Sequence, residues 1–363
     1  MIWIWLGFVS FILLMLALDL GVFHRKQHVV KLKEALAWSS VWISLALAFS
    51  AFVYVGYENH WLGLGTTPDA VDGRLNDGKA AMIKYLTGYV IEKSLSVDNV
   101  FVIAMIFAAF AVPTIYQHRV LFWGILGALA MRGAMIALGA TLIAEFHWIL
   151  YLFGAFLIVT AVKMLLVREH GDPSNNIVVR LARKVFPMTG RFHGKHFFVR
   201  AGSGASRAAA VPGAAVEPDP SVDQMQRTRP GALMMTPLFL ALILVEFTDL
   251  IFAVDSIPAI FAITADPFLV FTSNVFAILG LRSLYFALAG MLDKFRYLKM
   301  SLAAVLAVVG VKMLTAELLK RWVGSDVNLY LLGLVLLILA CGIVASMIVN
   351  HRENARRELA ATT

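Results

Sequence analysis

Long runs of hydrophobic residues, interrupted by short polar stretches, make up most of the chain. A run of about 20 mostly apolar residues is long enough to cross a bilayer as a helix. The pattern predicts nine such spans, at residues 1–23, 35–57, 81–112, 120–143, 148–167, 238–263, 268–292, 300–319 and 329–349. The expected fold class is therefore an all-α polytopic membrane protein.

The polar stretches divide the chain into segments. Residues 1–57 hold the first two spans, and residues 58–80 form an acidic, glycine-containing loop that we expect outside the membrane. The long connection 168–237 is basic, and its part 177–200 has the mixed apolar and basic pattern of an interfacial helix followed by a short hairpin. The stretch 201–230 is rich in Ala, Gly, Pro and Ser, which is typical of a disordered, solvated linker.

The distribution of charge predicts the orientation. Of all residues, 60% are hydrophobic and 15% are charged, and the net charge is +8. Lys and Arg lie mainly in short connections between spans, which is the positive-inside pattern rather than a nucleic-acid-binding surface. We expect an inner-membrane protein in the lipid bilayer, with the N-terminus outside, the tail 350–363 inside and no nucleic-acid partner. The first span lacks a basic n-region and a small-residue cleavage site, so we interpret it as a retained helix.

Three features recur in the same order at offsets of 157, 150 and 149 residues. The matched pairs are Glu92 with Asp249, Arg132 with Arg282, and Lys163 with Lys312. Such a recurrence indicates that the segments 81–167 and 238–319 are duplicated three-helix units. Because each unit has an odd number of spans, the two units cross in opposite senses and form an inverted repeat. Transporters built this way bind their substrate near the midplane, at the repeat interface.

Carboxylates at membrane depth mark the candidate site. Glu246, Asp249 and Asp255 lie near the middle of the predicted span 238–263. An ionisable residue at that depth indicates a functional site. Pro258 has no N–H, so we expect the helix to kink or open beside Asp255 and to free backbone oxygens.

The candidate metal ligands offer oxygen atoms. They are Glu92, Asp98, Asn99, Glu246, Asp249, Asp255 and Ser256. Oxygen donors without His or Cys suit Mg²⁺, Ca²⁺ or Mn²⁺ rather than Zn²⁺ or Cu²⁺. At about 100° per residue, Glu92 and Asn99 project from one face of a helix and Asp98 from another. A shared site therefore needs local unwinding or neighbours on two sides. The single Cys341 forms no intramolecular disulfide and argues against a thiolate metal site.

Basic residues at the same depth nearly balance the acids. The predicted charge partners or gating residues are Arg132, Arg282, Lys163 and Lys312. The alternative is that these residues form buried ion pairs that lock the bundle. Asp19, near the inner end of the first span, either lies on the ion path or pairs with a Lys or Arg at the interface.

Four motifs resemble the TerC/Alx family of integral membrane proteins. They are EKSLSVDN at 92–99, FAVDSIPA at 252–259, TSNVFAILGLRS at 272–283 and LDLGVF at 18–23. The resemblance covers most of the chain, but residues 202–230 look longer than the family's usual connection. It implies manganese export, a link to tellurium resistance, and metal ligation by the matched intramembrane acids Glu92, Asp98, Glu246, Asp249 and Asp255.

The expected function is export of Mn²⁺ from the cytoplasm in exchange for protons. Carboxylates desolvated beside one another favour protonation, and a bound divalent cation displaces those protons. We expect no enzyme and no resident cofactor, because no His lies among the central charges and no nucleophile with a base is evident.

Two other classes of protein remain open. A proton-coupled amino-acid or anion exporter would use Arg132 and Arg282 on its substrate. A membrane factor for tellurium resistance, or for insertion or metal loading of secreted proteins, would act without being the transporter itself.

Overall fold

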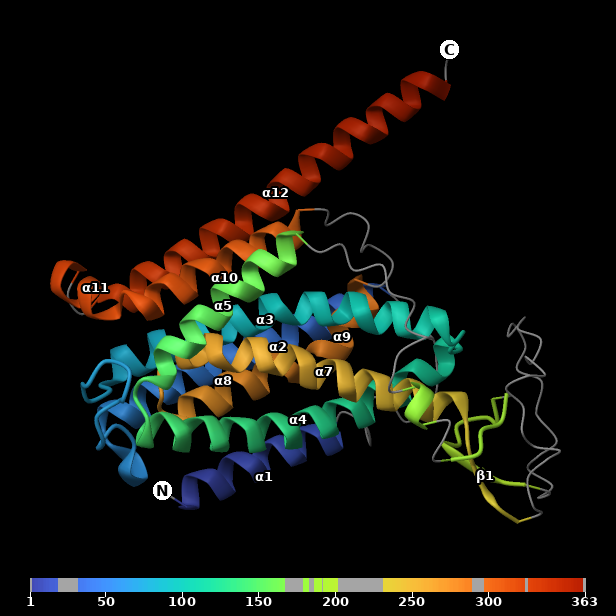
Figure 1. Ribbon diagram of the computed structural model, residues 1–363, viewed down its shortest axis with the longest axis horizontal. Coiled ribbons are helices and arrows are strands. Elements are labelled where there is room, and N and C mark those ends of the chain that lie inside the picture. Colours follow the sequence, from blue (N-terminus) through green and yellow to red (C-terminus); the bar gives the residue numbers. More distant parts are fainter. Residues whose placement is uncertain are drawn as a thin grey trace. The chain divides into compact units, whose positions relative to one another are not determined.

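A computed structural model describes residues 2–18, 32–166, 179–182, 186–190, 192–201, 231–288, 297–323 and 326–361. The described chain is mostly helical (Figure 1). Its helices in the first half are α1 (Ile2–Leu18), α2 (Leu32–Glu58), the short 3₁₀ helix η2 (Trp61–Gly63), α3 (Gly78–Ala109), α4 (Thr114–Glu145) and α5 (Ile149–Leu166). Those in the second half are α7 (Pro237–Phe261), α8 (Pro267–Leu279), α9 (Leu281–Leu288), α10 (Leu298–Leu314), α11 (Ala316–Val323) and α12 (Val327–Ala361).

Within the described residues, six segments are long and apolar enough to cross a membrane. They are Leu32–Glu58, Thr114–Glu145, Ile149–Leu166, Pro237–Phe261, Pro267–Leu288 and Val327–Asn350. The other three predicted spans correspond to α1 and α10, which are 17 residues long, and to α3, which carries five charged side chains. The multi-pass helical class is thus supported, while the count of nine spans and the inverted repeat stay predictions.

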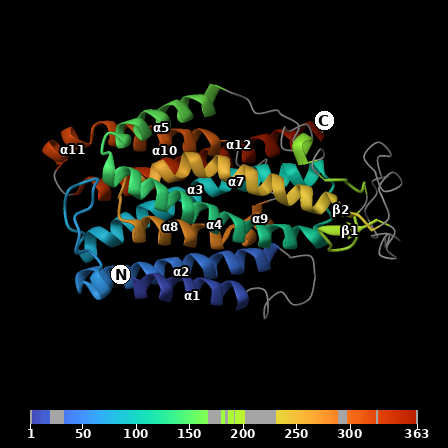
Figure 2. The same cartoon turned by 60° about the horizontal axis from the view of Figure 1, so that its bottom comes forward.

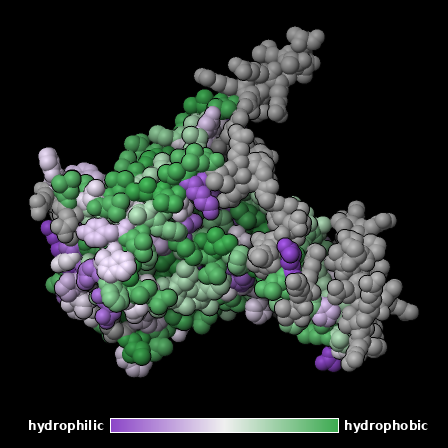
Figure 3. All heavy atoms as spheres, in the orientation of Figure 1, coloured by the Kyte–Doolittle hydropathy of each residue, from purple (hydrophilic) through white to green (hydrophobic). Residues whose placement is uncertain are grey.

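The described residues form two compact units. The first unit comprises Met1–Asp98, Arg132–Arg168 and Ala253–Thr363, and the second comprises Asn99–Met131 and Glu169–Phe252. Helices α3, α4 and α7 each contribute residues to both units. The surface of the first unit exposes many large apolar side chains, including Leu336, Leu337 and Met347 on α12. Hydrophobic residues also predominate on the face shown in Figure 3, as expected where lipid replaces water.

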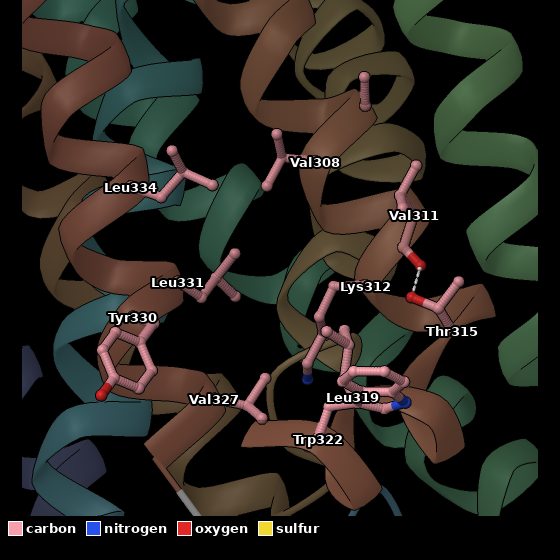
Figure 4. A pocket seen from close by; sticks show the side chains of 11 residues that line it. Val308, Val311, Lys312, Thr315, Leu319, Trp322, Val327, Tyr330, Leu331 and Leu334 are labelled. Atoms are coloured by element: carbon pink, nitrogen blue, oxygen red, sulfur yellow. Dashed lines mark hydrogen bonds between the residues drawn. The ribbon is translucent and has the colours of Figure 1, made fainter. Parts of the chain in front are cut away.

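In the first unit, α10 packs against both α5 and α12 (Figure 2). Gly154 on α5 and Gly310 on α10 allow the closest approach, since a Cβ added at Gly310 would lie 2.9 Å from the Gly154 carbonyl oxygen. Small residues at such contacts let two membrane helices pack closely. A cavity of about 830 Å³ lies beside this layer, between α10, α11 and α12, and is lined mostly by apolar side chains with Lys312 among them (Figure 4).

The structure corrects the prediction that the helix opens beside Asp255, and it places a break in a different predicted span. Helix α7 stays helical through Pro258 and ends at Phe261, so it does not open beside Asp255. Proline removes the bond to one carbonyl, four residues earlier, and the rest of the ladder remains. The break occurs instead in the predicted span 268–292, which divides at Gly280 into α8 and α9. The N-terminus of α8 is capped by Asp266, which is followed by Pro267 at the first helical position.

The described part of the second unit includes one small antiparallel sheet. Strand β1 (Phe198–Arg200) pairs with β2 (Leu233–Met235), in the register Phe198 to Met235. The hairpin predicted within residues 177–200 is therefore wrong in its pairing, because the partner strand lies directly before α7. Only residues 179–182 of the predicted interfacial helix are helical among those described. The predicted linker 202–230 lies outside the described residues.

Candidate functional site

Arg132 is the centre of a buried polar group in the first unit. Its side chain, on α4, is 2% exposed and forms an ion pair with Glu92 Oε1 on α3. The same guanidinium nitrogen lies 3.3 Å from Ser256 Oγ on α7 and 3.3 Å from Asn274 Oδ1 on α8. Four helices therefore meet at one charged side chain. Breaking such a buried pair by removing one partner strands an uncompensated charge.

This group retains polar atoms without a partner. Glu92 Oε2 and Asn274 Nδ2 are both buried and neither has a hydrogen bond. Buried polar atoms are normally paired, so an orphan of this kind points to an unseen ligand, ion or water. Asn274 was not assigned a role from the sequence, although an amide within the apolar run 268–281 is the same signal that singled out Asn99.

Asp255 is bonded to a further helix of the first unit, α5. Its Oδ1 accepts a hydrogen bond from the Thr160 hydroxyl on α5, at 3.1 Å. Ser256, the next residue, projects toward Arg132. Neighbouring residues of α7 thus contact different partners, as expected from a rotation of about 100° per residue.

A second group of oxygen atoms lies in the second unit. Asn99 Nδ2 donates to Asp249 Oδ1 at 3.3 Å, which leaves Asn99 Oδ1 buried without a partner. Glu246 Oε2 is also buried and unpaired. Its carboxylate packs against the backbone of α4 at Gly127, where an added Cβ would lie 2.0 Å from Glu246 Oε1. The absence of a side chain at residue 127 is what makes room for this acid.

The other predicted site residues have different environments. Asp98 is half-buried at the end of the first unit's part of α3, and Arg282 is buried on α9. Lys163 on α5 is exposed. Lys312 on α10 is buried and donates to the carbonyl of Ala262, directly after α7. Asp19 lies outside the described residues.

Lys93 donates a hydrogen bond to a carbonyl near the end of α8, as Lys312 does directly after α7. Its amino group donates to the Ala277 carbonyl at 3.2 Å, three residues before the break at Gly280. The last carbonyls of a helix lack partners within the helix and carry partial negative charge. Lys93 and Lys312 thus each stabilise a helix C-terminus inside the bundle.

The acids are divided between these groups. Among the residues that the structure describes, no three His, Cys, Asp or Glu side chains are placed together to hold a metal ion. The available donors are carboxylate, amide and hydroxyl oxygens, which is the set preferred by hard divalent cations. Each group holds only part of the predicted ligand set.

A third polar cluster was missed by the sequence analysis, which treated residues 58–80 only as an external loop. Asp69 in this loop is buried and pairs with Lys84 near the start of α3, at 2.8 Å. Burial by itself raises the pKa of Asp69, but the Lys84 ammonium and several hydrogen bonds hold that pKa below its ordinary value. The available signal was Lys84 itself, a cation within the apolar run that begins at Ala80.

Comparison with known proteins identifies the relatives of this chain. Residues 77–354 match the family described as "Integral membrane protein TerC family". A Myxococcus xanthus protein named "Uncharacterized membrane protein STKORF319" is 47% identical over 95% of this chain and 92% of its own length. An Escherichia coli protein named "Putative membrane-bound redox modulator Alx" is 42% identical over 98% of this chain and 97% of its own length.

A membrane protein of Rickettsia bellii is 38% identical over 85% of this chain and 87% of its own length. No solved structure matches the chain. The family match covers most of the residues and includes the motifs of α3, α7 and α8 that carry the polar groups described above. The chain is therefore a member of the TerC family of integral membrane proteins.

Proposed function

We propose that this protein exports Mn²⁺ from the cytoplasm across the inner membrane in exchange for protons. The observation that carries the proposal is the pair of buried, unpartnered oxygens, Asn99 Oδ1 and Glu246 Oε2, in the same unit as Asp249. A buried oxygen atom without a hydrogen-bond partner at membrane depth raises the free energy of the folded protein. A divalent cation bound by these oxygens would remove that cost.

The chemistry of the donors supports a hard cation. Asp249, Glu246 and Asn99 offer oxygen atoms alone, and the whole chain has one cysteine. Mg²⁺, Ca²⁺ and Mn²⁺ share this ligand preference, whereas soft or borderline ions favour thiolate or imidazole. The choice of Mn²⁺ among the three rests on the family resemblance.

Proton exchange follows from charge balance. Protonated carboxylates must lose their protons before they bind a metal ion, so the metal and H⁺ compete for the same oxygens. Arg132 serves as the permanent counter-charge of Glu92, which keeps that acid compensated when no cation is present. The remaining acids are then the groups whose protons exchange with the cargo.

Alternating access would come from two inverted three-helix repeats, 81–167 and 238–319, that rock about the site. In this proposal the complete coordination shell forms during the cycle, and Glu92, Asp98 and Asp255 belong to the predicted ligand set. The nine-span topology, with the N-terminus outside and the C-terminus inside, belongs to the same proposal.

A different candidate function comes from the name of the Alx relatives, redox modulator. The single Cys341, which is exposed on α12, gives one chain no pair of thiols for internal disulfide exchange. An effect on cellular redox state would then be indirect, through the supply of a metal ion. A membrane factor that assists tellurium resistance or metal loading, without transport of its own, is the alternative that a flux measurement separates.

The test is transport by the purified full-length protein in liposomes, with a Mn²⁺-sensitive dye and a pH dye recorded together. We expect Mn²⁺ movement in one direction and H⁺ movement in the other, and loss of both in Asp249→Asn and Asp255→Asn. Asp326→Asn is the matched control, because Asp326 is exposed at the start of α12. Flux no faster than in empty liposomes, or flux unaffected by both acid substitutions, would refute the proposal.

A further inference from the structure

The carboxylate of Asp69 connects two loops of the first unit. Its Oδ1 accepts from the backbone N–H groups of Val71 at 3.0 Å and Ala265 at 2.9 Å. Its Oδ2 accepts from Lys84 at 2.8 Å and from the Thr264 hydroxyl. The side chain has no exposed surface. One acid in the α2–α3 loop therefore fixes the turn 262–266 that follows α7.

Lys84 has three acceptors for its three N–H groups. They are Asp69 Oδ2, Asp72 Oδ2 at 2.7 Å and Asn76 Oδ1 at 2.6 Å. Asp69 and Lys84 are buried, but the Asp72 side chain is 24% exposed. Lys84 thus has one partner in the interior and another at the surface. It can leave Asp69 without becoming an unpaired charge, because Asp72 remains beside it.

Asp266 holds the other side of the same turn. Its Oδ1 accepts from the N–H of Phe268 at 3.0 Å, and its Oδ2 accepts from the Tyr57 hydroxyl at 2.8 Å. Asn76 Nδ2 lies 3.5 Å from both Asp266 Oδ2 and Asp69 Oδ2. The turn is therefore held by polar bonds to the end of α2 and to the α2–α3 loop, and Lys84 on α3 bonds the loop residues.

The turn joins two helices that contact Arg132. Ser256 on α7 and Asn274 on α8 both accept from its guanidinium. We propose that the Asp69–Lys84 pair is a latch that holds the α7–α8 turn, and that transport requires Lys84 to release Asp69 while it stays paired with Asp72. This inference rests on the proposed function, because it assumes that α7 and α8 move during a transport cycle.

A permanent structural contact at this position would gain from apolar side chains, since desolvating an ion pair offsets much of its attraction. A pair that opens has the opposite requirement. Its charges must find partners in the open state, and water and Asp72, whose side chain is 24% exposed, provide them. The latch and a permanent staple therefore predict different effects of removing Asp72.

The first measurement is hydrogen exchange of the turn in the purified full-length protein. The Asp69→Leu/Lys84→Met double variant removes both charges and the acceptor of the Ala265 N–H, so no unpaired charge is left in the interior. We expect exchange at least tenfold faster for the peptide that contains Ala265. Exchange equal to that of the wild type would overturn the latch, because the amide of Ala265 would then be protected without Asp69.

The second measurement uses Asp72→Asn, which removes the surface partner and leaves the buried pair intact. We expect exchange at the turn to be slower than in the wild type and Mn²⁺ flux in liposomes to fall several-fold. Asp326→Asn, another exposed acid, should change neither. Unchanged exchange and flux in Asp72→Asn would show a permanent staple and overturn the proposal, and this variant decides the matter if the double variant fails to fold.

Failure of the latch is distinguishable from failure of the proposed function. If the wild-type protein moves no Mn²⁺, the transport proposal fails, whereas the exchange rates of the two variants still decide whether the turn opens through this pair. If the wild type transports Mn²⁺ and the exchange rates do not change, only the latch is refuted.

Discussion

Gly127 and Glu246 are in such close contact that no side chain fits at residue 127. A Cβ added there would lie 2.0 Å from Oε1, 2.3 Å from Oε2 and 2.3 Å from Cδ of Glu246. Both residues belong to the second unit, and Glu246 Oε2 has no partner of its own. The backbone of α4 therefore fixes the position of an acid that we assign to the cation.

Gly127→Ala should displace the Glu246 carboxylate without changing any charge. We expect Mn²⁺ flux in liposomes to fall at least tenfold, because coordination distances of about 2.0–2.6 Å tolerate little displacement. Gly333→Ala is the control, since an added Cβ on α12 meets nothing within 4 Å. If Gly127→Ala has the same Mn²⁺ flux as the wild type, Glu246 does not bind the cation.

The Arg132–Glu92 pair predicts a non-additive effect on stability. Arg132→Met leaves a buried carboxylate unpaired and should lower the free energy of unfolding by about 3–5 kcal/mol. The double variant Arg132→Met/Glu92→Gln should lose clearly less free energy of unfolding than Arg132→Met, because neither member of the charged pair remains buried. Thermal unfolding in detergent measures both, and a double variant as unstable as the sum of the single variants would contradict the buried ion pair.

Lys93 on α3 and Lys163 on α5 offer a matched comparison of two lysines. Lys93→Met should lower the free energy of unfolding, because the Ala277 carbonyl loses its donor. The expected loss is about 1.5–3 kcal/mol, the usual contribution of a hydrogen bond from a charged group. Lys163→Met should change stability little, since Lys163 is exposed on α5. Equal melting temperatures for the two variants would argue against a stabilising role of Lys93 at the end of α8.

Asp266 in the α7–α8 turn and Asp69, which is bonded to that turn, should contribute to stability with opposite pH dependences. Burial, followed by the charge of Asp69, raises the pKa of Asp266, although bonds from Tyr57 and from two backbone N–H groups oppose the shift. A raised pKa in the folded state means that stability is fully present below the ordinary pKa and is lost as the pH rises through the raised one. Asp69, whose pKa is lowered, contributes stability above its ordinary pKa that is lost as the pH falls.

Asp266→Asn should therefore raise the melting temperature at neutral pH. At a pH below the ordinary pKa of an aspartate, it should leave the melting temperature unchanged. Asparagine is also a good N-cap, so the bonds to the first turn of α8 can persist. Asp69→Asn should lower the melting temperature at neutral pH. A fall in the Asp266→Asn melting temperature at neutral pH would contradict the raised pKa.

The class of protein and its family follow from the sequence alone. Apolar runs of about 20 residues leave little choice but membrane helices, because lipid cannot bond the backbone of any open structure. The described helices α2 and α5 begin and end within three residues of the predicted spans 35–57 and 148–167, whereas α4 begins at Thr114, six residues before the predicted span 120–143. The TerC motifs also identified the family correctly, since long local motifs need no tertiary information.

The tertiary structure alone decided which partner each charge has. Periodicity gives the face of a helix but not its neighbour, so it could not show that Arg132 contacts Glu92 and Asn274, or that Glu246 needs Gly127. For the same reason, a loop acid such as Asp69 looked solvated until Lys84 and Thr264 were seen around it. The positions of the helix breaks also could not be read from the sequence. Helix α7 stays helical through Pro258. Helix α8 ends at Leu279 and is capped by Gly280, where an added Cβ would lie 2.7 Å from the amino group of Lys93.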